Sequence, residues 1–159
     1  MAVDELLGCN MKILLVEDNQ TNCFLLSDYL EYCGYYVHAI TSSELFFSTL
    51  EWFQPNLILL DLKMPKIDGY TLLEEMQSCP LWKHIPVIVI SALSFRTHQT
   101  KAFQLGACRY LVKPIVPDIL KNVIQEELAN ATVASEDAEQ SIIHSSVIPF
   151  SIVTQAQVC

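Results

Sequence analysis

The sequence lacks the features that mark several large classes of protein. Its six cysteines are scattered, with no CxxC pair or other metal-ligand spacing, which argues against a zinc site and a disulfide scaffold. No apolar run approaches the ~18 residues that a membrane span needs. The first ten residues show neither the cationic region nor the long apolar stretch of a secretory signal. We therefore expect a cytoplasmic protein that does not enter a membrane.

Basic residues and glycines are also scarce. The chain has nine Lys and Arg against eighteen Asp and Glu, a formal net charge of −9, and all nine bases precede residue 122. Such a chain repels phosphate backbones and offers no basic recognition helix, so we expect no direct DNA binding. With four glycines in all, no glycine-rich phosphate loop follows the first apolar run, which argues against a flavin or nucleotide binder.

What the sequence contains instead is a repeated alternation of short apolar runs and helical patterns. Its 159 residues, 52% of them hydrophobic, suffice for one domain with a single large core. The apolar runs predict five strands, over 12–16, 35–40, 56–60, 87–91 and 109–112. A helix is expected after each, within 21–33, 42–54, 70–78, 95–105 and 117–128. Five such units in a row predict an α/β fold, a parallel sheet with helices on both faces.

The two ends of the chain differ from this pattern. Residues 1–10 read as an N-terminal extension, and 11–128 as the domain. From 129 to 141 the residues are small, polar and acidic, which predicts a linker or a frayed continuation of the last helix. The remaining segment is apolar enough to form a strand or to dock on the domain. We assign no role to residues 129–159.

Carboxylates follow two of the predicted strands. Glu17 and Asp18 come directly after the first strand, and Asp61 directly after the third. Ligands of open parallel sheets bind at the carboxyl ends of the strands, near the point where the strand order reverses, so these acids should share one rim. Because like charges repel, the cluster needs a compensating cation, and oxygen ligands suit Mg²⁺.

The fourth and fifth strands end in groups that bind phosphate. Ser91 supplies a hydroxyl and Lys113 an ammonium. Acids after strands can also cap helices: Asp18 or Asn19 could cap the first helix, and for Asp68 we prefer this interpretation. Ser42 or Ser43 could cap the second.

Four motifs carry a resemblance to a known family. VEDN at 16–19, LLDLKMPKIDG at 59–69, ISA at 90–92 and YLVKP at 110–114 closely resemble the receiver domain of two-component response regulators, over roughly 11–128. The resemblance implies a flavodoxin-like, doubly wound (βα)5 fold with a five-stranded sheet in the order 2-1-3-4-5. It also implies a signalling phosphoacceptor that catalyses only its own phosphorylation and slow dephosphorylation.

The family's chemistry maps onto matching positions. By resemblance, Asp61 accepts a phosphoryl group from a histidine kinase or histidine phosphotransfer protein. Asp18 binds Mg²⁺ directly, Glu17 acts mostly through water, and the backbone carbonyl of Lys63 completes the protein's ligands. Lys113 pairs with the phosphoryl oxygens.

The resemblance also implies a switch. Ser91 is expected to swing toward the phosphoryl group and Tyr110 to turn its ring inward, while the Lys113–Pro114 bond is expected to be cis. The surface of the fourth helix, fifth strand and fifth helix is thereby remade for a downstream protein, with the chain a monomer or a phosphorylation-dependent dimer.

Two questions stay open. A metal-dependent phosphohydrolase of the haloacid-dehalogenase type also places an aspartate after a strand, but it needs a second Asp two residues later, where this chain has Lys63. EDNQTN at 17–22 resembles receivers of hybrid kinases and phosphorelays, whereas Met1 and the tail favour a stand-alone regulator. The cognate kinase, stimulus and target are not encoded in recognisable form.

Overall fold

A single parallel sheet organises the molecule. The computed structural model describes residues 10–143, with side chains placed up to residue 134. Five parallel strands form one sheet in the order β2-β1-β3-β4-β5, which confirms the predicted fold class and strand order. Their bounds are β1 Lys12–Val16, β2 Tyr36–Ile40, β3 Leu57–Leu60, β4 Val87–Ser91 and β5 Arg109–Val112.

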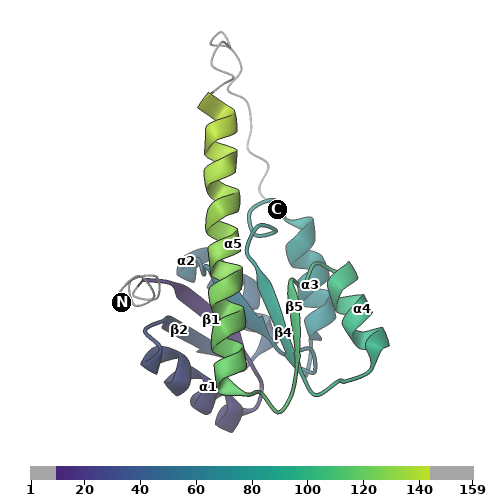
Figure 1. The fold of residues 1–159 in the computed structure, drawn as a ribbon. Helices are drawn as coiled ribbons and strands as arrows, with labels where there is room; N and C mark the ends of the chain where they lie inside the picture. Colours follow the sequence, from purple (N-terminus) through teal and green to yellow (C-terminus); the bar gives the residue numbers. More distant parts are fainter. Residues whose placement is uncertain (1–9, 144–159) are drawn as a thin grey trace.

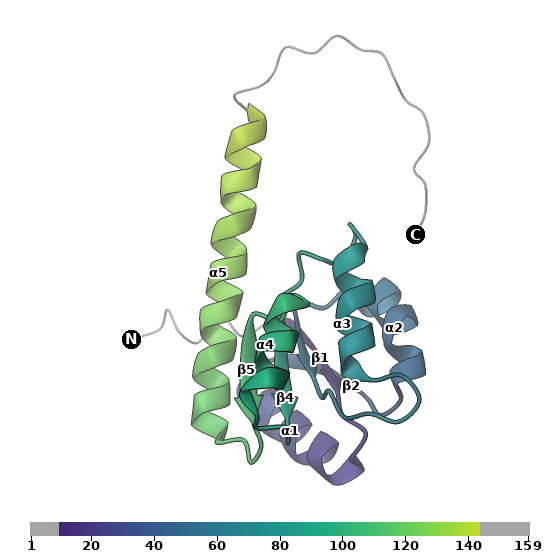
Figure 2. The ribbon, with the colours of Figure 1, turned by 90° about the vertical axis from the view of Figure 1, so that its right-hand side faces the viewer.

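Helices cover both faces of this sheet. α1 and α5 pack on one face, and α2, α3 and α4 on the other (Figures 1 and 2). The helices span α1 Gln20–Tyr32, α2 Phe46–Phe53, α3 Gly69–Ser78, α4 Arg96–Gln104 and α5 Pro117–Ile143, and a 3₁₀ turn at Ser43–Leu45 precedes α2.

The central strands β1, β3 and β4 are almost wholly apolar because both faces of the sheet are buried there. In β1, Leu14 and Val16 join the core beneath α2, α3 and α4, whereas Ile13 and Leu15 join the core beneath α1 and α5. Successive side chains of a strand point to opposite faces, so a strand covered on both sides has no place for a polar residue. The polar side chains of the central strands therefore stand at the strand ends or directly after them.

Two of the three predicted helix caps are present. The side chain of Asn19 accepts a hydrogen bond from the Asn22 amide at 3.0 Å, and Asp68 accepts one from the Thr71 amide at 3.0 Å. The predicted cap of the second helix is wrong, because Ser42 makes no cap bond. Ser43 instead donates to the Pro65 carbonyl at 3.1 Å and accepts from the Ile67 amide at 3.2 Å, which ties the start of α2 to the β3–α3 loop.

The last helix is longer than the predicted 117–128, because it continues to Ile143. Of the two expectations for residues 129–141, the helical continuation is the one found. The stretch contains no Gly or Pro and several Ala and Glu, which favour helix. Figure 1 shows α5 projecting beyond the sheet. None of the helices within residues 10–143 is long and apolar enough to cross a membrane.

The predicted N-terminal extension and the apolar segment at the C-terminus lie almost wholly outside the described residues, in 1–9 and 144–159. Only Ile142 and Ile143 of that segment are described, as the last residues of α5.

Candidate functional site

Three carboxylates meet at the carboxyl edge of the sheet. Glu17 and Asp18 follow β1, Asp61 follows the adjacent β3, and Val16 pairs in register with Leu60. One carboxylate oxygen from each of the three acids lies within 4.8 Å of the others. Glu17 is 1% exposed and Asp61 4% exposed. The strands thus bring the three acids to one rim of the sheet, as the sequence predicts, with Glu17 and Asp61 buried and Asp18 less so.

Lys113 faces this cluster from the end of β5. Its Nζ lies 2.5 Å from Oε2 of Glu17 and 2.8 Å from Oδ2 of Asp61. Burial opposes the charge of the ammonium, but the hydrogen bonds to Asp61 and Glu17 outweigh it and raise the pKa of Lys113 above its usual value. By formal charge, the three carboxylates and one ammonium sum to −2. The site therefore favours a divalent cation.

The donor set fits Mg²⁺. All three acids offer oxygen, and neither sulfur nor imidazole belongs to the cluster. Hard, oxygen-only sites with room for water and phosphate oxygens are those that Mg²⁺ prefers. The Lys63 amide donates to Oδ1 of Asp61 at 3.0 Å, so the chain after β3 turns back across the carboxylate. The role of the Lys63 carbonyl stays a prediction.

Ser91 and Tyr110 are joined through the loop that leads from β4 to α4. Ser91 is fully buried, and its Oγ accepts a hydrogen bond from the Leu93 amide at 3.3 Å. The Tyr110 hydroxyl donates to the Leu93 carbonyl at 2.7 Å. Burial raises the pKa of Tyr110, a hydrogen bond with Ser91 opposes that rise, and the charge of Asp61 adds to it. Both side chains therefore bond to the same loop, at Leu93.

The end of β5 is fixed against β4 as well. The Lys113 amide donates to the Ser91 carbonyl at 2.9 Å. The peptide bond between Lys113 and Pro114 is cis, which agrees with the prediction. The backbone thus places the Lys113 side chain beside the strand end that carries Ser91.

Gly69 positions the start of α3, a role that the sequence reasoning missed. A Cβ on this residue would lie 2.6 Å from the Asp61 carbonyl oxygen and 2.7 Å from the Leu62 Cα. The Gly69 amide also donates to the Leu62 carbonyl at 3.0 Å. Only glycine permits this approach, so α3 packs directly on the backbone that carries Asp61. The signal was the Asp-Gly pair at 68–69, which we assigned to the loop and a cap.

Comparison with known proteins agrees with this geometry. The family model of the response regulator receiver domain matches residues 13–125. A two-component response regulator of Arabidopsis thaliana is 37% identical over 120 residues, which cover 72% of this chain and 21% of that protein. The chain spans about a fifth to a half of the length of the first curated relatives that it matches.

Solved structures show the same similarity. A response regulator from Chloroflexus aurantiacus superposes with a TM-score of 0.72 at 30% identity, covering 76% of this chain and 98% of that one. The receiver domain of a sensor histidine kinase from Pseudomonas aeruginosa superposes with a TM-score of 0.70 at 27% identity, covering 76% and 98%. That structure has a magnesium ion in its active-site cleft. The matches described here give no support to a haloacid-dehalogenase assignment.

Proposed function

Because the chain belongs to the receiver-domain family of response regulators, we propose that Asp61 accepts a phosphoryl group from a phosphohistidine of a partner protein. An oxygen of the Asp61 carboxylate attacks phosphorus. A P–O bond forms, the P–N bond breaks, and the departing imidazole keeps the electron pair and takes a proton. The product is an acyl phosphate. The burial of Asp61 beside Glu17, Asp18 and Lys113 is the observation that supports this proposal.

The acids around Asp61 would hold Mg²⁺. Glu17, Asp18, Asp61 and the Lys63 carbonyl are the proposed ligands, and Mg²⁺ would neutralise charge on the phosphoryl oxygens. Lys113 would exchange its contact with Asp61 for one with the phosphoryl group, since the ammonium already points at the carboxylate that becomes modified. Ser91 would donate its hydroxyl to the same group, and the Leu93 loop would follow.

The phosphodonor protein would dock beside this edge of the sheet, over α1. A cavity of about 690 Å³ lies between α1 and the segment after β5, with Lys113 in its wall. Its apolar lining includes Leu26, Tyr29 and Ile115. On the outer surface of α1, Phe24 is 70% exposed. An exposed apolar surface next to buried reactive groups supports docking of a protein partner there.

The output surface would be α4, β5 and α5. Phe95 and Phe103 of the α4 region, Val112 of β5 and Ile119 of α5 are large apolar side chains exposed to solvent. Tyr110 contacts Phe103 at 6.5 Å between ring centroids and bonds to the Leu93 loop, so movement of Ser91 would be transmitted to this surface. A downstream protein would recognise the altered surface.

The test is direct phosphorylation. The protein is incubated with Mg²⁺ and acetyl phosphate, and its intact mass is measured. We expect a mass gain of one phosphoryl group that hydroxylamine removes. Asp61→Asn should abolish the gain, whereas Asp68→Asn should keep it, because Asp68 caps α3. A wild-type protein that stays unmodified and binds no Mg²⁺ would refute the proposal.

A further inference from the structure

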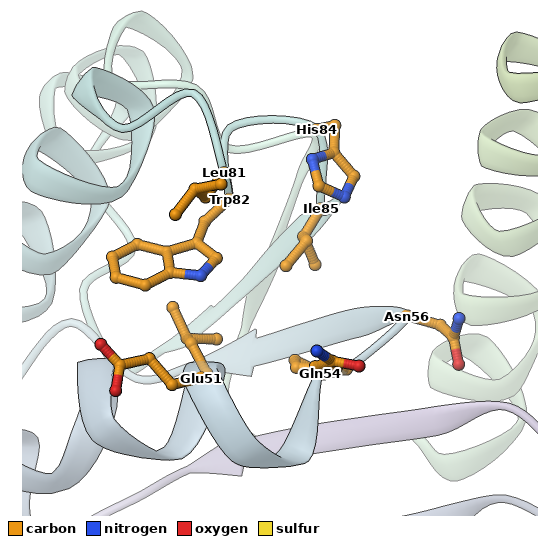
Figure 3. Close-up of a pocket in the computed structure, with 9 residues that line it drawn as sticks. Glu51, Gln54, Asn56, Leu81, Trp82, His84 and Ile85 are labelled. Atoms are coloured by element: carbon orange, nitrogen blue, oxygen red, sulfur yellow. The ribbon is translucent and has the colours of Figure 1, made fainter. Parts of the chain in front are cut away.

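A groove crosses the molecule at the amino edge of the sheet, opposite the acidic site. Its first section, of about 520 Å³, lies between α2, the start of β3 and the loop from α3 to β4 (Figure 3). Figure 3 shows the Trp82 ring and the Ile85 side chain pointing into this space above α2. The volume is within the range of ligand-binding sites. Nothing in the proposed phosphoryl transfer uses it.

The groove continues to α5. A second section of about 470 Å³ shares Pro55, Asn56, His84 and Ile85 with the first. Its far wall is formed by Leu128, Ala131, Thr132 and Ala134 of α5. The two cavities are therefore neighbours, and together we call them the amino-edge groove, whose lining reaches from α2 to α5.

Large apolar side chains line this groove without being covered. Leu81 is 61% exposed, and Trp82 is half-buried, with its ring 5.4 Å from that of Phe47. Leu50, which is 1% exposed, and Pro55 also line this section, together with the neutral polar side chains of Gln54 and Asn56 and with His84, and Glu51 is its one carboxylate. A concave surface that combines exposed apolar side chains with so little charge fits an uncharged peptide rich in apolar side chains.

Such a peptide belongs to this chain. Residues 145–159 contain no Asp, Glu, Lys or Arg, although the whole chain has a net charge of −9. The segment includes Val147, Ile148, Phe150, Ile152 and Val153. Moving so many apolar side chains out of water is favourable, and the groove offers apolar surface on which they can be buried.

The covalent connection makes the encounter intramolecular. From Ala134 in the groove wall to Ile143, where α5 ends, the helix rises about 14 Å. The sixteen residues after Ile143 span up to ~50 Å when extended. About five residues, 144–148, suffice for the return, which leaves Phe150, Ile152 and Val153 free to lie in the groove. A tether of this length also gives a high effective concentration.

We propose that the apolar segment 145–159 docks into the amino-edge groove of its own chain and covers Trp82. This inference goes beyond the proposed phosphoryl transfer and does not depend on it, because the groove and the acidic site lie at opposite edges of the sheet. The docked segment would cover the exposed apolar side chains on this side of the molecule.

Trp82 reports on this contact in the full-length protein. The chain has two tryptophans, and Trp52 is 62% exposed on α2, so Trp52→Phe leaves Trp82 as the only indole. In that background we expect Phe150→Asp to uncover the Trp82 ring and to raise its quenching by acrylamide about twofold. Ser145→Asp adds the same charge before the first apolar side chain, Val147, in the part of the segment that returns to the groove, and it should leave the quenching unchanged.

A second variant tests the groove itself. Leu81→Asp should release the segment and accelerate chymotrypsin cleavage after Phe150, followed by intact mass, while Leu81→Met should keep the parent rate. Leu81 is exposed, so neither change removes a core contact. Equal quenching in the parent and in Phe150→Asp would overturn the proposal. Cleavage after Phe150 that becomes slower at higher protein concentration, together with the mass of a dimer in solution, would also overturn the proposal, in favour of docking on a second copy.

Discussion

The two edges of the sheet both bury ionisable groups, but they balance them differently. At the carboxyl edge, Glu17, Asp18 and Asp61 share the single ammonium of Lys113. At the amino edge, the buried carboxylate of Glu127 on α5 lies 2.9 Å from Nη2 of Arg109 on β5. The amino-edge pair joins two consecutive elements and leaves no excess charge in the interior. The carboxyl-edge cluster joins β1, β3 and β5 and leaves an excess of negative charge.

The cysteine at the amino edge is also unreactive. The thiol of Cys108 donates to the Val87 carbonyl at 3.1 Å. Burial, followed by the charge of Glu127, raises the pKa of Cys108 to about 12. A thiol held in its neutral form is a poor nucleophile. Burial of an ionisable group therefore does not mark a functional site by itself. A more specific sign of a functional site is a cluster of buried charges that neighbouring groups do not fully neutralise.

The largest expected effect comes from removing the cation at each edge. Lys113→Met leaves Glu17 and Asp61 without their ammonium, and we expect a loss of about 3 kcal/mol in the free energy of unfolding without Mg²⁺. Arg109→Met should cost about 2 kcal/mol, since Arg109 is partly exposed and its pair is weakened by solvent. Urea denaturation measures both.

Magnesium should then separate the two variants. Without the ammonium the carboxylates should bind Mg²⁺ more tightly. For a tenfold lower Kd, saturating Mg²⁺ would add about 1.4 kcal/mol more to Lys113→Met than to the wild type. It should restore nothing to Arg109→Met beyond what it adds to the wild type. Equal recovery of both variants would contradict the distinction between the edges.

A smaller loss of stability is expected from Gly69→Ala. The added Cβ would overlap the backbone of Asp61 and Leu62, which costs about 2 kcal/mol and moves Asp61. Gly34→Ala is the matched control: its φ of 92° is unfavourable for alanine, but nothing lies within 4 Å of the added Cβ. We expect it to cost about 1 kcal/mol and to leave phosphorylation by acetyl phosphate unchanged. Thermal or urea unfolding and the intact-mass assay test both variants.

The excess charge at the carboxyl edge predicts a specific loss of metal affinity. Asp18→Asn should weaken Mg²⁺ binding about tenfold, or about 1.4 kcal/mol, in a calorimetric titration. Glu126→Gln removes one charge at the amino edge, where Glu126 lies 3.5 Å from Arg109. It should leave the Mg²⁺ affinity unchanged. Similar losses in the two variants would mean that net charge, and not the geometry of the acids, sets the affinity.

The smallest effect concerns the loop between the site and the output surface. Tyr110→Phe removes the hydrogen bond from the Tyr110 hydroxyl to the Leu93 carbonyl, at a cost of about 1 kcal/mol in the free energy of unfolding. The Mg²⁺ affinity should not change, because the hydroxyl is no ligand. A change in Mg²⁺ affinity equal to that of Asp18→Asn would show that the loop and the acids cannot be separated.

The features that follow from local pattern could be predicted from the sequence. Apolar runs such as 57–60 fix buried strands, so the acid that follows each run must lie at one edge of the sheet. Asn19 and Asp68 as helix caps follow from residue type and position. Each of these predictions depends on residues that are near one another along the chain.

The individual contacts between distant residues could not be predicted. The contact of Lys113 with Glu17 joins residues 96 positions apart, and without the fold the lysine has no assigned partner among the acids. The Ser43 hydroxyl bonds to the loop before α3 instead of capping α2, which no local pattern reveals. The need for glycine at position 69 arises from the backbone of Asp61, and it is visible only in three dimensions.

The length of α5 has a mechanical consequence. The helix begins at Pro117, close to the cis bond after Lys113, and it is about 40 Å long at 1.5 Å per residue. A tilt of about 5° at its first turn would carry Ile143 through roughly 3.5 Å, far more than the displacement at the hinge itself. A small rearrangement beside Lys113 would therefore produce a much larger displacement at the C-terminal end of α5.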